Sequence, residues 1–156
     1  MRRLAATLIL LVGIAAGWMV LRAAADDPDR RGLVVGIVDG DTLDVRVLAT
    51  RERVRVLGID TPERGSCFSR RAAAETSRLA LGRRVKLQRD SSQPERDRFD
   101  RLLAYVELPD ERDLGLELVE RGFARVFVIG RPFERLKSYR KAESLGRAQR
   151  ASIWRC

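Results

Sequence analysis

LVVGIVDGDTLDVRVLATRERVRVLGI, residues 33–59, contains three Val-rich segments that are joined by short polar connections. Within them apolar and polar residues alternate, as around Leu43 and Val45, which is the period-2 pattern of a half-buried strand. Asp39 and Gly40 form a turn signal between the first two segments, because Gly tolerates positive φ. The stretch therefore predicts a β-meander with strands over residues 33–38, 42–48 and 53–59.

The rest of the chain alternates between helical and extended patterns. Small and apolar residues recur at helical spacing over 69–81, before a stop signal at Gly82. Asp113 is placed to cap a short helix that runs through Glu120, and a last helix is expected from near Pro132 to about Arg150, with Leu145 facing inward. Extended segments are expected at residues 85–87, 102–107 and 123–128. The pattern predicts an α+β fold: a five-stranded barrel of the oligonucleotide-binding (OB-fold) type with three helices.

The N-terminal residues have a different composition from the rest. The chain has 156 residues, of which 45% are hydrophobic and 34% charged, as in a globular domain. Residues 1–25 instead open with Arg2 and Arg3, run apolar over 4–21 and close on Ala23, Ala24 and Ala25, the layout of a cleaved signal peptide. The run is also just long enough for a membrane anchor. Both alternatives place the domain, residues 32–156, outside the cytosol after a linker over 26–31.

The net charge favours a polyanionic partner without deciding the question. It is +9 for the whole chain, and residues 1–25 contain three Arg and no acid, so the remainder carries +6. A basic surface suits nucleic acid, and the alternative is a surface that only keeps the protein soluble.

The chain has no His and only two Cys, Cys67 and Cys156. This composition excludes histidine-ligated zinc, Ser-His-Asp triads and histidine general bases, so hydrolytic chemistry would have to use carboxylates. Outside the cytosol the two Cys are expected to pair in a disulfide, the alternative being two unpaired thiols.

Acidic residues stand at the predicted ends of strands in this basic chain. Asp41 follows the first turn and Asp60 ends the third strand, so the meander would bring both to one end of the sheet. Two carboxylates and a backbone carbonyl form a hard-oxygen site that suits Ca²⁺. Arg55, near the end of the third strand, matches phosphate oxygens bidentately. Glu63, which emerges after Pro62, would be placed to act on water.

Each of these pieces also has an ordinary structural interpretation. DGDT is typical of a polar turn, DTPE of a loop, and Arg101 of a salt-bridge cluster with Asp97 and Asp100.

The order and spacing of the pieces resemble the staphylococcal nuclease (thermonuclease-like) family. The similar stretches are VDGDT at 38–42, RVLGIDTPE at 55–63, DRFDRLLAYV at 97–106, LVERGFARV at 118–126 and IW at 153–154. The resemblance implies an OB-fold barrel with three helices and Ca²⁺-dependent hydrolysis of DNA and RNA that leaves 3′-phosphate ends.

Carried over by position, the resemblance implies three metal ligands: the side chains of Asp41 and Asp60, and the carbonyl of Thr61. It also implies that Glu63 acts on water, and that Arg55 and Arg101 bind the scissile phosphate.

The sequence departs from the family at several positions. Asp100 stands where the family usually has Gly, beside Arg101, with which it could pair. Phe99 replaces a phosphate-contacting Tyr, and Val128 and Gly130 replace base-stacking tyrosines, which predicts weaker mononucleotide binding.

The resulting hypothesis is an exported, monomeric nuclease of low sequence and sugar specificity, either secreted or periplasmic, with possible membrane attachment through residues 4–21. The alternative is an OB-fold nucleic-acid-binding module that is catalytically weak or inactive. A cell-envelope protein that binds anionic polymers leaves the order of the motifs unexplained.

Overall fold

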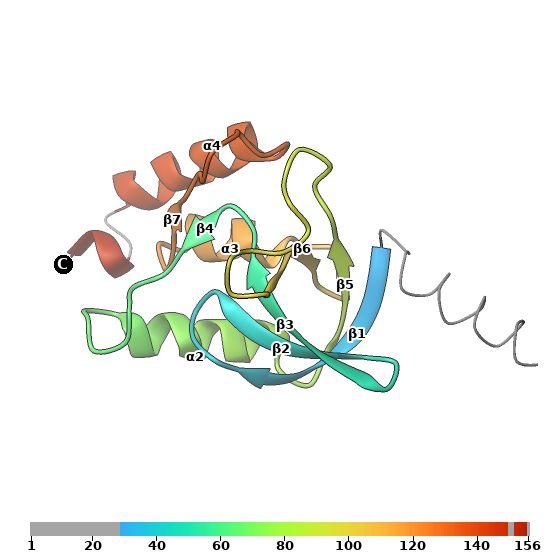
Figure 1. The fold of residues 1–156 in the computed structure, drawn as a ribbon. Helices are drawn as coiled ribbons and strands as arrows, with labels where there is room; N and C mark the ends of the chain where they lie inside the picture. The colour runs from blue at the N-terminus through green and yellow to red at the C-terminus, as the bar shows by residue number, and fades with distance from the viewer. Residues whose placement is uncertain (1–28, 150–151, 156) are drawn as a thin grey trace, which may run out of the picture.

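The computed structural model describes residues 29–149 and 152–155, and its centre is a closed five-stranded barrel (Figure 1). The strands follow the order β1-β2-β3-β6-β5, in which β3 and β6 are parallel and the other neighbours antiparallel. Their bounds are β1 Asp29–Ile37, β2 Thr42–Val47, β3 Thr50–Val56, β5 Arg84–Gln88 and β6 Leu102–Glu107. The predicted α+β barrel with its opening meander is confirmed.

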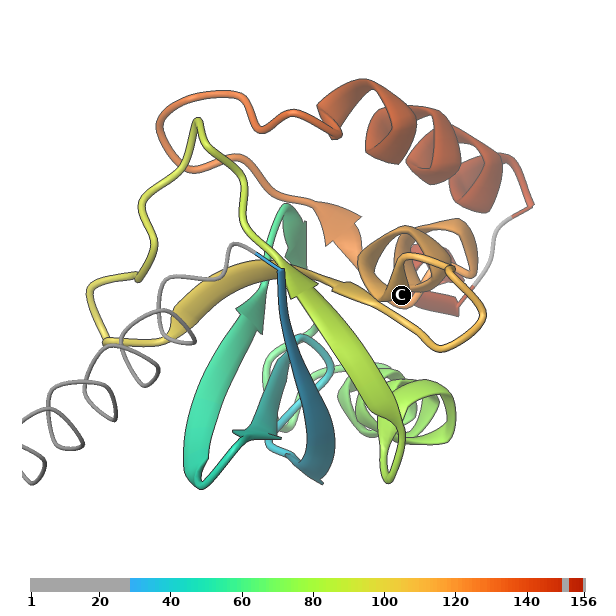
Figure 2. The same ribbon diagram turned by 90° about the vertical axis from the view of Figure 1, so that its right-hand side faces the viewer.

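Three α-helices gather on one side of the barrel (Figure 2). They are α2 Ser69–Ala80, α3 Leu114–Glu120 and α4 Leu136–Ala148, and a short 3₁₀-helix η1 follows at Ser152–Arg155. Asp113 caps α3 as expected, since its side chain accepts hydrogen bonds from the N–H groups of Gly115 and Leu116.

The barrel core follows the period-2 pattern of the sequence. Leu43, Val45 and Val54 are completely buried, and Val56 is 1% exposed. Because side chains alternate between the two faces of a strand, the intervening residues of β2 and β3 lie on the outer face. Only these outer-face side chains of β2 and β3 are therefore available to a functional site outside the core.

The third predicted strand is shorter than expected at its C-terminal end. β3 ends at Val56, and the chain turns at Gly58 before a separate strand, β4 Ile59–Asp60, which pairs with β7 Arg125–Val126. Gly58 has φ +79°, and a Cβ there would lie 2.6 Å from the Phe133 ring, so both the backbone and the packing require Gly. The turn moves the backbone of Asp60 out of the barrel sheet, while its carboxylate still contacts Arg55 of β3.

Two further boundaries differ from the prediction. Residues 29–31, expected as part of the linker, belong to β1 and pair with β5, because Arg30 and Arg31 lie opposite Leu87 and Lys86. The extended segment expected at 123–128 is a strand only over Arg125–Val126.

The last helix begins later than the sequence indicates, at Leu136 rather than near Pro132. The preceding backbone is held by tertiary contacts, since the Glu134 N–H donates to Asp90 Oδ2 at 2.8 Å. Leu145 is 44% exposed, so its predicted inward position is wrong. Tyr139, Ala142 and Gly146 occupy the buried face of α4 instead, and a Cβ on Gly146 would lie 3.0 Å from the carbonyl oxygen of Val119 in α3. The predicted end at Arg150 lies outside the described residues.

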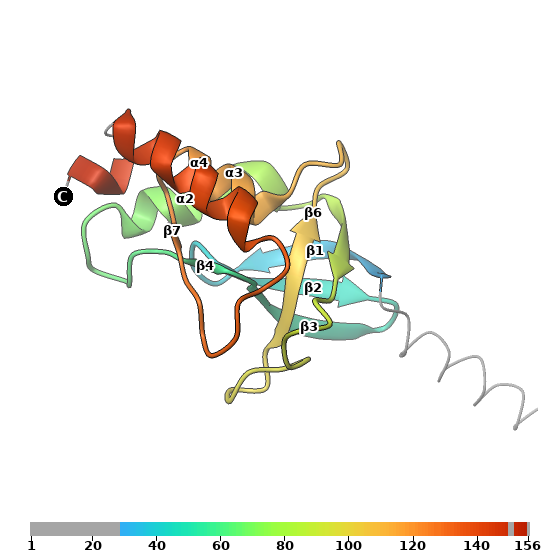
Figure 3. The ribbon, with the colours of Figure 1, turned by 90° about the horizontal axis from the view of Figure 1, so that it is seen from above.

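Two loops that are distant in sequence lie side by side at the open end of the barrel (Figure 3). One precedes β6 and the other follows β7. Ser92 Oγ donates to the carbonyl of Pro132 at 3.2 Å, and Gln93 Nε2 donates to that of Arg131 at 2.9 Å. Together the two loops form a wall of the cavity described next.

Candidate active site

Asp41 is a buried carboxylate at the turn between β1 and β2. It is 5% exposed, and its Oδ2 accepts hydrogen bonds from Thr61 N–H at 2.8 Å and Thr61 Oγ1 at 2.9 Å. Burial raises the pKa of Asp41 above its ordinary value, although the Arg55 guanidinium and the Thr61 N–H act in the opposite direction. A Cβ on Gly40 would lie 2.7 Å from Thr61 Oγ1, so Gly permits this close approach.

Arg55 links the two acids that the sequence singled out. It lies on the outer face of β3, where its Nε is 3.3 Å from Asp41 Oδ1 and its Nη2 is 3.3 Å from Asp60 Oδ1. Its Nη1 also donates to the carbonyl oxygens of Ile59 at 2.8 Å and Val56 at 3.0 Å. The side chain is only 12% exposed, so these contacts hold the guanidinium in one orientation.

Asp60 and Thr61 reach the site from β4. The side chain of Asp60 is 46% exposed, whereas Thr61 is buried at 5% exposure. The backbone of Asp60 pairs with that of Arg125 in β7. The separate β4 strand therefore presents one open carboxylate beside the buried Asp41.

Arg101 approaches the same place from the start of β6. Its Nε and Nη2 lie 2.7 and 2.6 Å from Asp97 Oδ2, and its Nη1 donates to Thr42 Oγ1 at 3.4 Å. Thr42 in turn donates to Asp41 Oδ1 at 3.1 Å. Burial acts to raise the pKa of Asp97, but hydrogen bonds from Arg101 and from the Phe99 N–H outweigh it and lower that pKa.

The expected pairing of Asp100 with Arg101 does not occur. The Asp100 side chain is 89% exposed and lies 3.6 Å from Arg96 Nε, while Asp97 is the partner of Arg101. Asp100 has φ +61°, in the left-handed region that favours Gly. The conformation explains why Gly suits this position.

Glu63 lines the same cavity and is exposed. It follows Pro62, and its backbone carbonyl accepts a hydrogen bond from the Ser66 N–H at 2.9 Å. This turn supports the backbone and leaves the carboxylate at the solvent-accessible side of the site.

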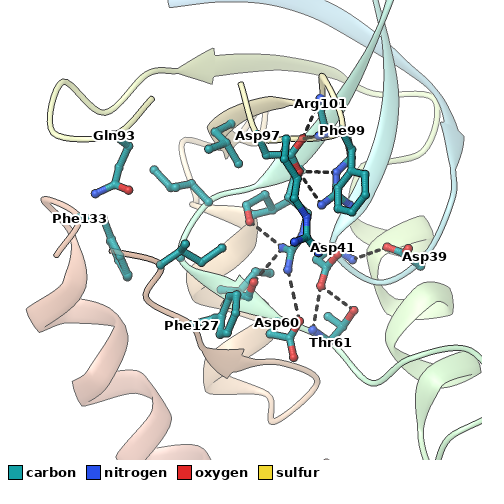
Figure 4. A pocket seen from close by; sticks show the side chains of 18 of the residues that line it. Asp39, Asp41, Asp60, Thr61, Gln93, Asp97, Phe99, Arg101, Phe127 and Phe133 are labelled. Atoms are coloured by element: carbon teal, nitrogen blue, oxygen red, sulfur yellow. Dashed lines mark hydrogen bonds and ion pairs between the residues drawn. The ribbon is translucent and has the colours of Figure 1, made fainter. Parts of the chain in front are cut away.

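These residues share one cavity of about 810 Å³. Figure 4 shows Asp41, Asp60 and Thr61 close together, and Arg101 with Asp97 further along the same wall. The cavity is also lined by aromatic and apolar side chains that the sequence analysis did not select, among them Phe127 and Ile129, which are 44% and 69% exposed. Large apolar residues that stay exposed beside a polar cluster are a typical sign of a binding surface, but the sequence alone does not reveal their exposure.

The donor atoms fit a hard cation. The side chains of Asp41 and Asp60 and the carbonyl of Thr61 offer only oxygen, which suits Ca²⁺ and not a soft metal. Among the described residues, no group of three or more Asp, Glu or Cys is placed to hold a metal ion. A cation at this site would therefore take its other ligands from backbone, water or substrate, and the ligand roles stay predictions.

The fold and site together define a class: an OB-fold barrel in which the guanidinium groups of Arg55 and Arg101 lie in one cavity with several carboxylates, an arrangement suited to a phosphodiester. The staphylococcal nuclease homologue family matches residues 53–156. The micrococcal nuclease of Shigella flexneri is 31% identical over 164 residues, covering 99% of this chain and 84% of that protein. The thermonuclease of Staphylococcus intermedius is 34% identical over 99 residues, covering 60% and 57%. The chain belongs to the staphylococcal nuclease family, and its class is that of hydrolytic nucleases.

Some predictions fall outside the described residues. The signal peptide or anchor over 1–25 does so, as does Cys156, so its pairing with Cys67 stays a prediction. In the part of the chain that the structure describes, no helix has the length and apolar character needed to cross a membrane.

Proposed function

We propose that this nuclease hydrolyses DNA and RNA phosphodiester bonds with Ca²⁺, with little sequence or sugar specificity, and leaves 3′-phosphate ends. The observation that carries the proposal is the position of Arg55, which contacts both Asp41 and Asp60 in the cavity that also holds Glu63 and Arg101. Two oriented guanidinium groups would stabilise the negative charge that develops on a phosphate in this cavity.

Asp41, Asp60 and the Thr61 carbonyl would hold the Ca²⁺ ion, which when bound would neutralise charge on the phosphate oxygens. Arg55 and Arg101 would donate hydrogen bonds to the same phosphate. Their carboxylate partners fix both guanidinium groups before substrate arrives, so little reorganisation is needed at the moment of reaction.

Glu63 would act as the general base. Its carboxylate takes a proton from the attacking water, whose oxygen forms a new bond to phosphorus. The bond from phosphorus to the 5′ oxygen breaks, and that oxygen takes up a proton as it leaves. The exposed position of Glu63 at the cavity allows water to reach it.

Chelation tests the metal requirement. Residues 26–156 are expected to cleave single-stranded DNA in the presence of Ca²⁺ and to lose that activity when a chelator is in excess, because only oxygen donors suited to a hard cation line the site. Restoring Ca²⁺ should restore cleavage, which is measured as the release of acid-soluble nucleotide. Cleavage that is insensitive to the chelator would contradict the proposal, and DNA binding without cleavage under any divalent ion would favour the binding-module alternative.

We expect Phe127 to replace the absent base-stacking tyrosines. It lines the cavity, and its N–H donates to the Gly58 carbonyl at 2.9 Å, which places its backbone beside the turn into β4. Stacking on an aromatic side chain contributes about 1 to 3 kcal/mol per base. Phe127→Ala should therefore raise KM for single-stranded DNA by roughly 5- to 150-fold.

Leu145→Ala on α4 is the matched control for Phe127→Ala, because Leu145 is also 44% exposed and lies outside the cavity. It should leave KM unchanged. Equal KM values for the Phe127 variant and the parent would exclude a role in binding the base.

We also propose that the protein is exported, and that its N-terminal segment is a signal peptide or an anchor. The basis is the composition of residues 1–25. The mass of the protein recovered from the envelope or the medium distinguishes a cleaved segment from a retained one.

A further inference from the structure

The outer face of β3 carries three Arg residues at alternate positions: Arg51, Arg53 and Arg55. Val54 and Val56, which alternate with them, are buried in the core, so the three Arg share the opposite face. Arg55 belongs to the proposed active site. Arg51 and Arg53 do not line the cavity, and they lie on β3 between Arg55 and the β2–β3 turn.

A buried carboxylate orients the two outer guanidinium groups. Asp44, directly opposite Arg53 on β2, is 4% exposed. Arg53 Nε lies 3.0 Å from Asp44 Oδ1, and Arg51 Nη2 lies 2.7 Å from Asp44 Oδ2. Burial acts to raise the pKa of Asp44, but hydrogen bonds from Arg53 and Arg51 outweigh it and lower that pKa. Asp44 is therefore ionised and holds both Arg side chains in place.

The same contacts leave most of each Arg available to solvent. The side chains of Arg51 and Arg53 are 63% and 54% exposed, whereas that of Asp44 is only 5% exposed beneath them. Each guanidinium has five N–H donors, and one shared carboxylate can accept only part of them. Arg46, opposite Arg51 on β2, is exposed as well, so the four charged residues present a net charge of +2.

We propose that Arg51 and Arg53 form a second phosphate-binding subsite, which binds the backbone of a polynucleotide strand that extends beyond the scissile phosphate. The chemistry is the charge-assisted, bidentate recognition for which Arg is suited. Orientation by Asp44 lowers the entropy that the two side chains would otherwise lose on binding. The inference rests on the proposed function only for the identity of the polyanion as a nucleic acid.

The geometry of the strand sets the length of substrate that can use the subsite. Alternate residues of a strand are about 6.8 Å apart, so Arg51 lies about 14 Å along β3 from Arg55. A substrate with a single phosphodiester cannot reach from the active site to Arg51. A strand of several nucleotides can, within the 4 to 16 nucleotides that an OB fold typically covers. The subsite would therefore favour polynucleotides over short fragments.

The test measures equilibrium binding of a fluorescent single-stranded 16-mer to residues 26–156 in excess chelator, over a series of salt concentrations. Each phosphate contact contributes about 0.7 to the slope of log K against log salt on a single strand. The double variant Arg51→Gln with Arg53→Gln is expected to flatten that slope by about 1.4. In cleavage assays it should raise KM for long DNA but leave hydrolysis of a thymidine p-nitrophenyl phosphodiester unchanged.

Two further variants keep the result interpretable. The double variant Arg140→Gln with Lys141→Gln removes the same charge from exposed positions on α4, on the far side of the barrel from the β2–β3 hairpin (Figure 1), and should preserve the slope. Adding Asp44→Asn to the Arg variant removes the buried carboxylate that would be left without partners, in case the double variant does not fold.

An unchanged slope in a folded Arg51 and Arg53 variant, or an equal change in the α4 control, would overturn the subsite. Arg51 and Arg53 would then serve only to form ion pairs with Asp44 in the β2–β3 hairpin. Failure of the proposed function would look different, because a parent protein that does not cleave DNA can still show the expected change in binding slope.

Discussion

Glu63→Gln is expected to lower kcat for single-stranded DNA by roughly two to four orders of magnitude, the usual contribution of a positioned general base. The amide has nearly the same shape as the carboxylate but cannot take a proton from water. Because Glu63 is exposed, the thermal unfolding curve should match that of the parent. The measurement is initial velocity at saturating substrate and Ca²⁺, together with circular dichroism on the same preparation.

Glu120→Gln provides the control, since Glu120 is an exposed residue at the end of α3 and is not among the residues that line the cavity. It removes the same charge and should leave kcat unchanged. A Glu63 variant whose kcat stays within a few-fold of the parent value would remove Glu63 from the mechanism. Arg55 and Arg101 could still bind phosphate in that case, and another route for the water proton would be needed.

Asp113→Ala is expected to have the largest effect on stability among the variants considered. One carboxylate caps α3 through the N–H groups of Gly115 and Leu116, accepts from Tyr139 Oη at 2.8 Å, and lies 2.6 Å from Arg135 Nη1. Losing the helix cap lowers the free energy of unfolding by about 1 kcal/mol. Leaving the buried Tyr139 hydroxyl without its acceptor lowers it by about 1 to 3 kcal/mol more. The free energy of unfolding in urea should fall by roughly 3 kcal/mol.

Two companion variants show whether the network is the cause. Asp113→Asn keeps an oxygen that can cap α3 and accept from Tyr139, so its loss should be clearly smaller. Asp110→Ala removes an exposed acid that contacts Arg112 and should change stability little. Equal losses for Asp113→Ala and Asp110→Ala would show that Asp113 does not connect α3 and α4 as its contacts indicate.

Local signals predicted most of the fold. The alternation around Leu43 and Val45 defined β2, and Asp113 marked the start of α3, because both effects act within a few neighbouring residues. The start of α4 was missed because contacts from Asp90, more than 40 residues away, hold the Glu134 backbone. Leu145 was misplaced because α4 packs through the face that carries Tyr139, Ala142 and Gly146, where the Gly146 backbone closely approaches α3.

The candidate site was predicted in part, through the order and spacing of its motifs. The structure places Asp41 and Asp60 on the same guanidinium, that of Arg55, as the meander predicts. Of the two predicted partners of Arg101, only Asp97 contacts it, because Asp100 adopts a left-handed conformation and its exposed carboxylate contacts Arg96 instead. Phe127 was missed because exposure is a property of the folded surface.

By itself the sequence determined most of the strand and helix segments, the absence of histidine chemistry and the types of residue available for a metal and a phosphate. Those properties depend on composition and on neighbours along the chain. Tertiary structure alone decided which charges pair, which apolar side chains stay exposed beside the cavity, and that Asp44 orients two Arg outside it. Such contacts depend on strand register and on closure of the barrel, which bring together residues that no local pattern relates.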